Sequence, residues 1–138
     1  MYKAIITDKV CEISKDILGV ELRAAQARDL DDDCLIVHAH FNVPSKPIDL
    51  NLVYSRESTK ALLSAAYEGN SSMFSHESNI EDITSEVSSL LFHRLKYFLK
   101  QADVNCDAPN AKVISKTCLL EQGEPMVFLI EDSVVLKA

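Results

Sequence analysis

Two stretches of the chain alternate between apolar and polar residues, as a half-buried β-strand does. In residues 34–43, His38, His40 and Asn42 point one way and the apolar positions point the other way: Leu35, Val37, Ala39, Phe41 and Val43. In residues 48–54 the apolar positions are Ile48, Leu50, Leu52 and Tyr54. The prolines at 44 and 47 interrupt the alternation, so the pattern predicts a β-hairpin with a four-residue loop.

Three other stretches have the periodicity of helices. Residues 3–18 repeat apolar side chains at Ile6, Val10, Ile13 and Ile17, and Gly19 is a natural C-terminal stop. Ser55 can cap a helix over residues 56–67. The inner face of that helix would hold Leu62, Leu63 and Ala66.

The strongest periodic stretch predicts a long helix over residues 80–101. Ser78 and Glu81 have the spacing of a capping box, which places the start of the helix beside them. The apolar stripe of this helix consists of Ile80, Ile83, Val87, Leu90, Leu91, Leu95 and Phe98.

Strand patterns over residues 112–120, 125–130 and 133–137 close the chain. Because the strands are expected to pair through hairpins, this order predicts an α+β fold, an antiparallel β-sheet with two or three helices packed on it. No internal repeat or long linker divides residues 1–138, so we expect a single domain.

Composition narrows the classes of function. The formal charge of −7 and the lack of a Lys/Arg cluster argue against nucleic-acid binding. Only three glycines occur, which excludes phosphate-cradling glycine-rich loops. We expect neither a secretory signal nor a membrane span, four reduced and buried cysteines, and hence a cytoplasmic location. No cofactor and no metal site are predicted.

Several segments resemble the CheX/CheC family of chemotaxis phosphatases. Residues 4–22, AIITDKVCEISKDILGVEL, are similar to the family's first helix, and residues 81–94, EDITSEVSSLLFHR, to its helix with a Glu-x-x-Asn core preceded by an acidic residue. Residues 107–114, DAPNAKVI, are similar to its loop into the late strands. The resemblance is one of pattern and covers most of the chain.

That resemblance implies a fold with two long helices on one face of a sheet and an activity toward the aspartyl phosphate of a CheY-like response regulator. It also implies that Glu86 contacts the receiver domain and that Ser89 occupies the position of the Asn that orients the attacking water. Serine is a departure, because a short hydroxyl replaces an amide with both a donor and an acceptor. His93 stands where the family usually has a small residue.

Asp82, Glu86, Ser89 and His93 fall on one line of the predicted helix, beside the apolar stripe. The resemblance implies that this line binds a receiver domain, with Glu86 and Ser89 as the candidate catalytic pair. A solvated helix face and a Ser-His-acid nucleophilic arrangement are the alternatives for these residues. His38 and His40 could bind a metal or form the polar face of an edge strand, and we favour the polar face.

Three functions remain open from the sequence. The first is an aspartyl-phosphate phosphatase with weak activity. The second is a receiver-binding module that has lost catalysis. The third is a homodimeric structural module that pairs through exposed strand edges around residues 113–120 or 127–136, since family members pair through their sheets.

Overall fold

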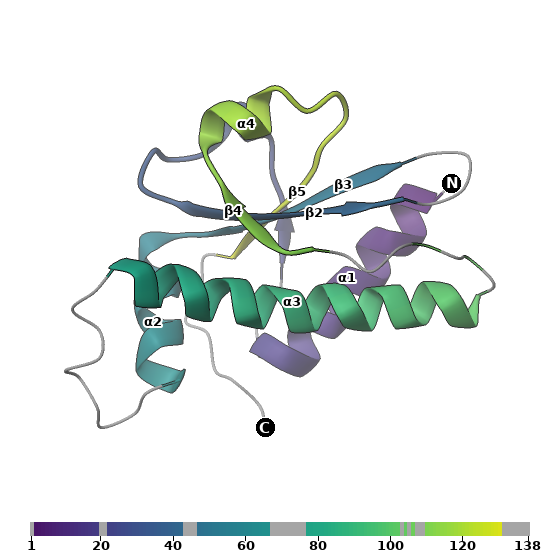
Figure 1. Ribbon diagram of the computed structural model, residues 1–138, viewed down its shortest axis with the longest axis horizontal. Helices are drawn as coiled ribbons and strands as arrows, with labels where there is room; N and C mark the ends of the chain where they lie inside the picture. Colours follow the sequence, from purple (N-terminus) through teal and green to yellow (C-terminus); the bar gives the residue numbers. More distant parts are fainter. Residues whose placement is uncertain are drawn as a thin grey trace.

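A mixed β-sheet lies at the centre of the fold (Figure 1). The computed structural model describes residues 2–19, 22–42, 47–66, 77–102, 104, 106 and 110–130. Within these residues, five strands form one sheet in the order β1-β5-β3-β2-β4. The strands are β1 (Arg23–Ala24), β5 (Met126–Ile130), β3 (Ile48–Tyr54), β2 (Leu35–Phe41) and β4 (Lys112–Ile114).

The predicted pairing of the hairpin is confirmed by the antiparallel strands β2 and β3, in which Leu35 pairs with Tyr54 and Phe41 with Ile48. Residues 43–46, which include most of the predicted four-residue loop, lie outside the described residues. The α+β class is also confirmed. The sheet is not antiparallel throughout, because β3 and β5 run parallel, with Leu50 beside Met126. The prediction of an antiparallel sheet is wrong at this pair. The chain between these two strands passes through helices and another strand, and such a long crossover permits a parallel neighbour.

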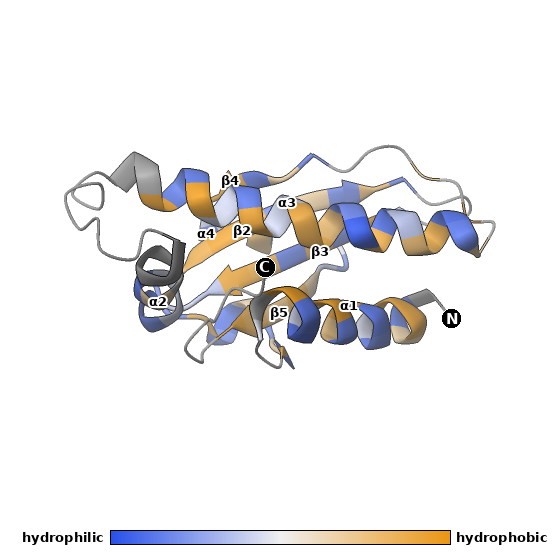
Figure 2. Cartoon of the chain, turned by 90° about the horizontal axis from the view of Figure 1, so that it is seen from below, coloured by the Kyte–Doolittle hydropathy of each residue, from blue (hydrophilic) through white to orange (hydrophobic). Residues whose placement is uncertain are grey.

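Two helices cover one face of the sheet. The helices α1 (Tyr2–Leu18) and α3 (Glu77–Gln101) lie side by side below it, and Figure 2 views them from that side. Their apolar stripes and the inward residues of β2 and β3 form the larger core, which includes Val10, Ala39, Leu52, Leu91 and Leu95, all fully buried. The helix α2 (Arg56–Ala66) contacts α3 at one end of this layer.

The second face of the sheet is covered by smaller elements. The 3-10 helix η1 (Ala27–Asp29) and the short helix α4 (Lys116–Leu120) contact each other there. A second apolar cluster lies beneath them and consists of Leu30, Ile36, Val53, Leu119 and Val127. This cover buries the centre of the sheet on both sides, so Ile36 and Val53 are buried although they point away from the larger core.

The strand predicted over residues 112–120 is wrong beyond Ile114. There the chain turns into α4, because the Ser115 side chain caps the helix by accepting a hydrogen bond from the backbone N–H of Cys118 at 3.2 Å. A short apolar run does not distinguish a strand from a single helical turn, and the local cap decides the matter. The strand predicted over residues 133–137 lies outside the described residues.

The predicted helices are confirmed with small shifts of their ends. Gly19 ends α1 with a φ of 68°, in the left-handed region that glycine adopts without a steric penalty. Ser55 caps α2 by accepting a hydrogen bond from the backbone N–H of Ser58 at 3.1 Å, but the side chains of residues 62, 63 and 66 are outside the described part. The structure begins α3 at Glu77, so Ser78 lies within the helix and not at its N-cap.

Two further expectations about burial are wrong. Leu90, predicted in the apolar stripe of α3, is 57% exposed, while Phe92 and Leu99 are buried in its place. The four cysteines carry free thiols as predicted, but Cys118 is exposed and the other three are half-buried. In both cases the sequence pattern identified an apolar residue, and the packing of neighbouring elements decided its burial.

A buried hydrogen bond joins the sheet to α3, and we predict that its loss destabilises the fold. The Tyr54 hydroxyl lies 2.7 Å from Ser88 Oγ in the fully buried layer between β3 and α3. Tyr54→Phe leaves the Ser88 hydroxyl without this partner, so the free energy of unfolding should fall by about 1–3 kcal/mol. Urea denaturation measures the change.

Tyr97→Phe is the matched control, because Tyr97 is 65% exposed and its hydroxyl can bond to water. It should change the free energy of unfolding by less than about 0.5 kcal/mol. In Tyr54→Phe/Ser88→Ala both polar partners are removed, and part of the loss should be recovered. An equal effect of the Tyr54 and Tyr97 substitutions would contradict this account.

Candidate functional site

Contacts on the buried side of α3 determine how the helix is oriented about its own axis relative to the sheet. In addition to the bond between Tyr54 and Ser88, the ring of Phe92 packs edge-on against Phe41, with ring centroids 6.0 Å apart and an interplanar angle of 74°. Both contacts involve adjacent turns in the middle of the helix. They hold one face of α3 against β2 and β3, and the opposite face of the same turns points outward.

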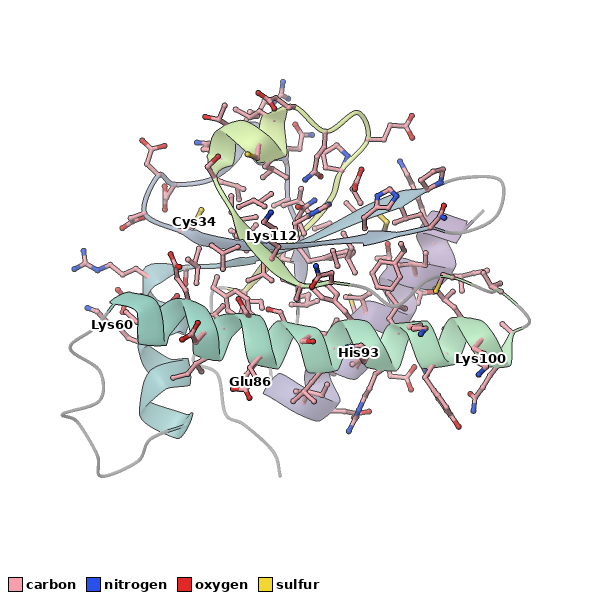
Figure 3. All side chains as sticks on the ribbon, viewed as in Figure 1. Cys34, Lys60, Glu86, His93, Lys100 and Lys112 are labelled. Carbon is pink, nitrogen blue, oxygen red and sulfur yellow. The ribbon has the colours of Figure 1, made fainter. Side chains whose placement is uncertain are left out.

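The four predicted site residues lie on this outward face. Asp82, Glu86 and His93 are exposed and Ser89 is half-buried. Successive members are four, three and four residues apart, which makes neighbours on a helix surface. Figure 3 labels Glu86 and His93 on α3, with Glu86 on the side of the helix turned away from the sheet.

No described side chain competes for these groups. Within the described part of the chain, the side chains of Asp82, Glu86, Ser89 and His93 have no hydrogen-bond or ion-pair partner. The carboxylates of Asp82 and Glu86, the Ser89 hydroxyl and the His93 ring are therefore available to a partner molecule. A single helix cannot enclose them, so their face is convex.

This arrangement does not assemble a nucleophilic triad. Ser89 and His93 are not hydrogen-bonded to each other in the described structure, and Glu86 lies two turns from His93. An activated serine needs a base within hydrogen-bond reach and groups that stabilise an oxyanion. The face could act chemically only when a second molecule brings its own reactive group to it.

A groove next to this face was not predicted from the sequence. It has a volume of about 440 Å³ and runs between α1 and α3. The residues that line it are Lys9, Glu12, Ile13, Asp16, Leu90, His93, Arg94, Tyr97, Phe98 and Gln101. Leu90 and Tyr97, seven residues apart and both exposed, could have indicated it, because large apolar side chains two turns apart mark a second apolar strip on the helix.

The outer face of the sheet carries a separate polar cluster. Asp49 Oδ1 accepts hydrogen bonds from His38 Nε2 at 2.8 Å and from His40 Nδ1 at 2.9 Å. Burial raises the pKa of Asp49, but the hydrogen bonds from His40 and His38 outweigh it, and the pKa is lowered. The two histidines therefore hold the carboxylate of Asp49 on the outer face of β2. The prediction that they lie on an edge strand is wrong, because β2 lies between β3 and β4 in the sheet.

A metal centre is not found among the residues that the structure describes. They include no group of three or more His, Cys, Asp or Glu side chains arranged to hold an ion. In the same part of the chain, no helix combines the length and the apolar character needed to cross a bilayer.

We predict that the cluster of Asp49, His38 and His40 makes the free energy of unfolding depend on pH in the acid range. Because the pKa of Asp49 is lowered from its ordinary value of 3.8, the ionised carboxylate stabilises the folded state above that value. This contribution is lost as the pH falls through the lowered pKa. The difference in unfolding free energy between the wild type and Asp49→Asn should therefore shrink as the pH is reduced from about 4.5 to about 2.5 in urea titrations.

Asp8→Asn is the matched control, because Asp8 is exposed on α1 and its carboxylate has no partner in the described residues. Its difference from the wild type should stay nearly constant over the same range. A constant difference for Asp49→Asn as well would refute a stabilising role for the cluster.

Comparison with known proteins gives no relative on which to base a function. No family model, no curated protein and no solved structure matches the chain. A functional proposal therefore rests on the geometry of α3 and on the expectation drawn from its sequence.

Proposed function

We propose that the protein binds the receiver domain of a CheY-like response regulator through the outer face of α3, as a divergent relative of the CheX/CheC phosphatases. In this proposal the protein acts in the cytoplasm, where receiver domains are phosphorylated. Glu86 contacts the receiver, Asp82 and His93 extend the contact, and Ser89 faces the aspartyl phosphate. The receiver supplies the phosphoryl group and the metal that its own chemistry requires.

One observation carries the proposal: Glu86 and its neighbours are presented outward from a long helix whose opposite side is anchored in the core. A rigid helix positions side chains more accurately than a loop does. Its convex shape suits insertion into the phosphorylation site of another protein. The absence of competing partners in the described part supports the same use.

Ser89 makes weak catalysis the expected outcome. Hydrolysis of an acyl phosphate depends mainly on the placement of water and on electrostatic stabilisation. An Asn side chain reaches farther than a serine hydroxyl and can donate and accept hydrogen bonds at separate atoms. We therefore infer that binding is retained and that the acceleration of phosphate loss is small or absent.

Reversal of the charge of Glu86 tests the binding surface. Glu86→Lys should weaken binding to the cognate receiver at least about tenfold, because it replaces a contact carboxylate by a cation on the docking face. Binding is measured by titration against a panel of purified receiver domains, phosphorylated or loaded with beryllofluoride.

Glu121→Lys is the matched control, since it makes the same change of charge at an exposed residue after α4, on the other side of the sheet. It should leave the affinity within about twofold. If no receiver in the panel binds the wild type, the proposed function is wrong. Equal weakening by both substitutions would mean that net charge is responsible and not the face of α3.

Replacement of Ser89 by Asn, the residue that CheX/CheC phosphatases have at this position, provides an independent test of the site. Ser89→Asn should increase the rate of receiver dephosphorylation on the order of tenfold to a hundredfold, because the longer side chain can orient the attacking water. The rate is measured as the loss of phosphate from the receiver after the phosphodonor is removed. Ser89→Ala should not exceed the wild type, and an Asn variant with the wild-type rate would contradict the role of this position.

A further inference from the structure

We propose that the groove between α1 and α3 is a self-association surface, in which two copies of the chain pair through their helical faces. The proposal differs from pairing through strand edges. The occupant of the groove is the corresponding helical face of a second copy, and the contact covers the outward side of α3.

The apolar part of this surface lies on α3. Leu90 and Tyr97 are 57% and 65% exposed, and they stand two helical turns apart at the mouth of the groove. Ile13, at the base of the groove, is already buried against the core, and Phe98 is half-buried. A second α3 would offer the same two projecting side chains to the groove, as a helix that docks in a groove does with anchors spaced by seven.

The charges on the two walls are self-complementary. The wall formed by α1 carries Glu12 and Asp16, whereas the wall formed by α3 carries Arg94 beside His93. Lys9 is already engaged, since its Nζ lies 3.4 Å from Glu12 Oε1 and 4.7 Å from the ring centroid of Phe98. The α1 wall is therefore acidic on balance and the α3 wall is basic.

Asp16 and Arg94 line the same groove without forming an ion pair with each other or with another described residue. A twofold axis makes every contact occur twice in a reciprocal manner. If the twofold axis runs parallel to the groove at its mouth, the α3 wall of each copy lies opposite the α1 wall of the other. Arg94 of each copy then faces Asp16 of the other copy. One geometry thus pairs both exposed charges and covers both apolar residues, which favours a second copy as the occupant of the groove.

The available area is sufficient for a weak dimer. The 17 residues of α1 correspond to a length of about 25 Å, and two adjacent helices are about 20 Å wide. The face therefore offers about 500 Å² per copy, or about 1,000 Å² in total, at the lower limit for a specific interface. Interfaces of this size are typical of weak or transient association.

Self-association would regulate the candidate site. His93 lines the groove, and Glu86 lies on the same outer strip of α3 as Leu90 and His93, so a second copy would exclude a receiver from this face. This consequence rests on the proposed function. The interface itself does not, and it can be tested without any receiver.

Sedimentation equilibrium from about 5 to about 500 μM tests the interface. The wild type should change from monomer to dimer over this range. Arg94→Glu and Asp16→Arg should each weaken association at least about tenfold, because each places like charges opposite each other. The double variant Asp16→Arg/Arg94→Glu restores an opposite pair and should dimerise within about threefold of the wild type.

Arg28→Glu is the control, since it reverses an exposed charge on η1 at the other face of the sheet, and it should not alter the dissociation constant. Tyr97→Ala should weaken the dimer, while circular dichroism verifies that the variants remain folded. A wild type that stays monomeric at about 500 μM would overturn the proposal. A dimer that is insensitive to Arg94→Glu and to Tyr97→Ala, or a double variant without recovery, would overturn it as well.

Failure of this test leaves receiver binding by the monomer intact. Conversely, a dimer with the expected charge dependence that binds no receiver would support the interface and refute the proposed function. The two proposals are therefore separable.

Discussion

The attachment of α3 to the sheet is the constraint on which the candidate site depends. The hydrogen bond between Tyr54 and Ser88 and the contact between Phe41 and Phe92 act on consecutive turns of the same helix. A helix held at two adjacent turns cannot rotate about its axis without breaking buried contacts. The direction of Glu86 and Ser89 is therefore set by residues on β2, β3 and the hidden side of α3, none of which belongs to the candidate site.

The two faces of the sheet differ in the size of the apolar cluster that they bury and in the elements that cover them. The face beneath α1 and α3 contains the larger core and presents the outer helical surface with its groove. The opposite face is covered by η1 and α4 over a smaller cluster. On that same side Asn51 and Gln122 form a reciprocal pair of amide hydrogen bonds, at 2.8 and 3.1 Å, which ties the segment after α4 to β3. The polar side chains that β2 and β3 present on that face, His38, His40, Asp49 and Asn51, are thus hydrogen-bonded. Those on the outer face of α3, Asp82, Glu86, Ser89 and His93, have no partner among the described residues.

The outer face of α3 has the properties of a docking surface more than those of an enclosed active site. Its groups are exposed, unpaired within the described residues and arranged on a convex helix. Such a face has no means of excluding water or of stabilising charge that develops during a reaction. Any chemistry at Ser89 would depend on a partner with a preorganised site, and a second copy would compete with that partner for the same helix.

The elements with a strong hydrophobic period could be predicted from the amino-acid sequence: the hairpin of β2 and β3, the helices α1, α2 and α3, and the line from Asp82 to His93. These follow from local rules, because the repeat of apolar residues defines which face of a strand or helix is buried. The parallel pairing of β5 with β3 and the exposure of Leu90 followed from packing between distant parts of the chain, and the helix over residues 116–120 followed from the cap at Ser115. The tertiary structure also places α1 beside α3, which creates the groove. These features depend on contacts between residues far apart in the chain or, for residues 116–120, on a local cap. Such contacts and caps leave the spacing of apolar residues unchanged, so the hydrophobic pattern alone does not reveal them.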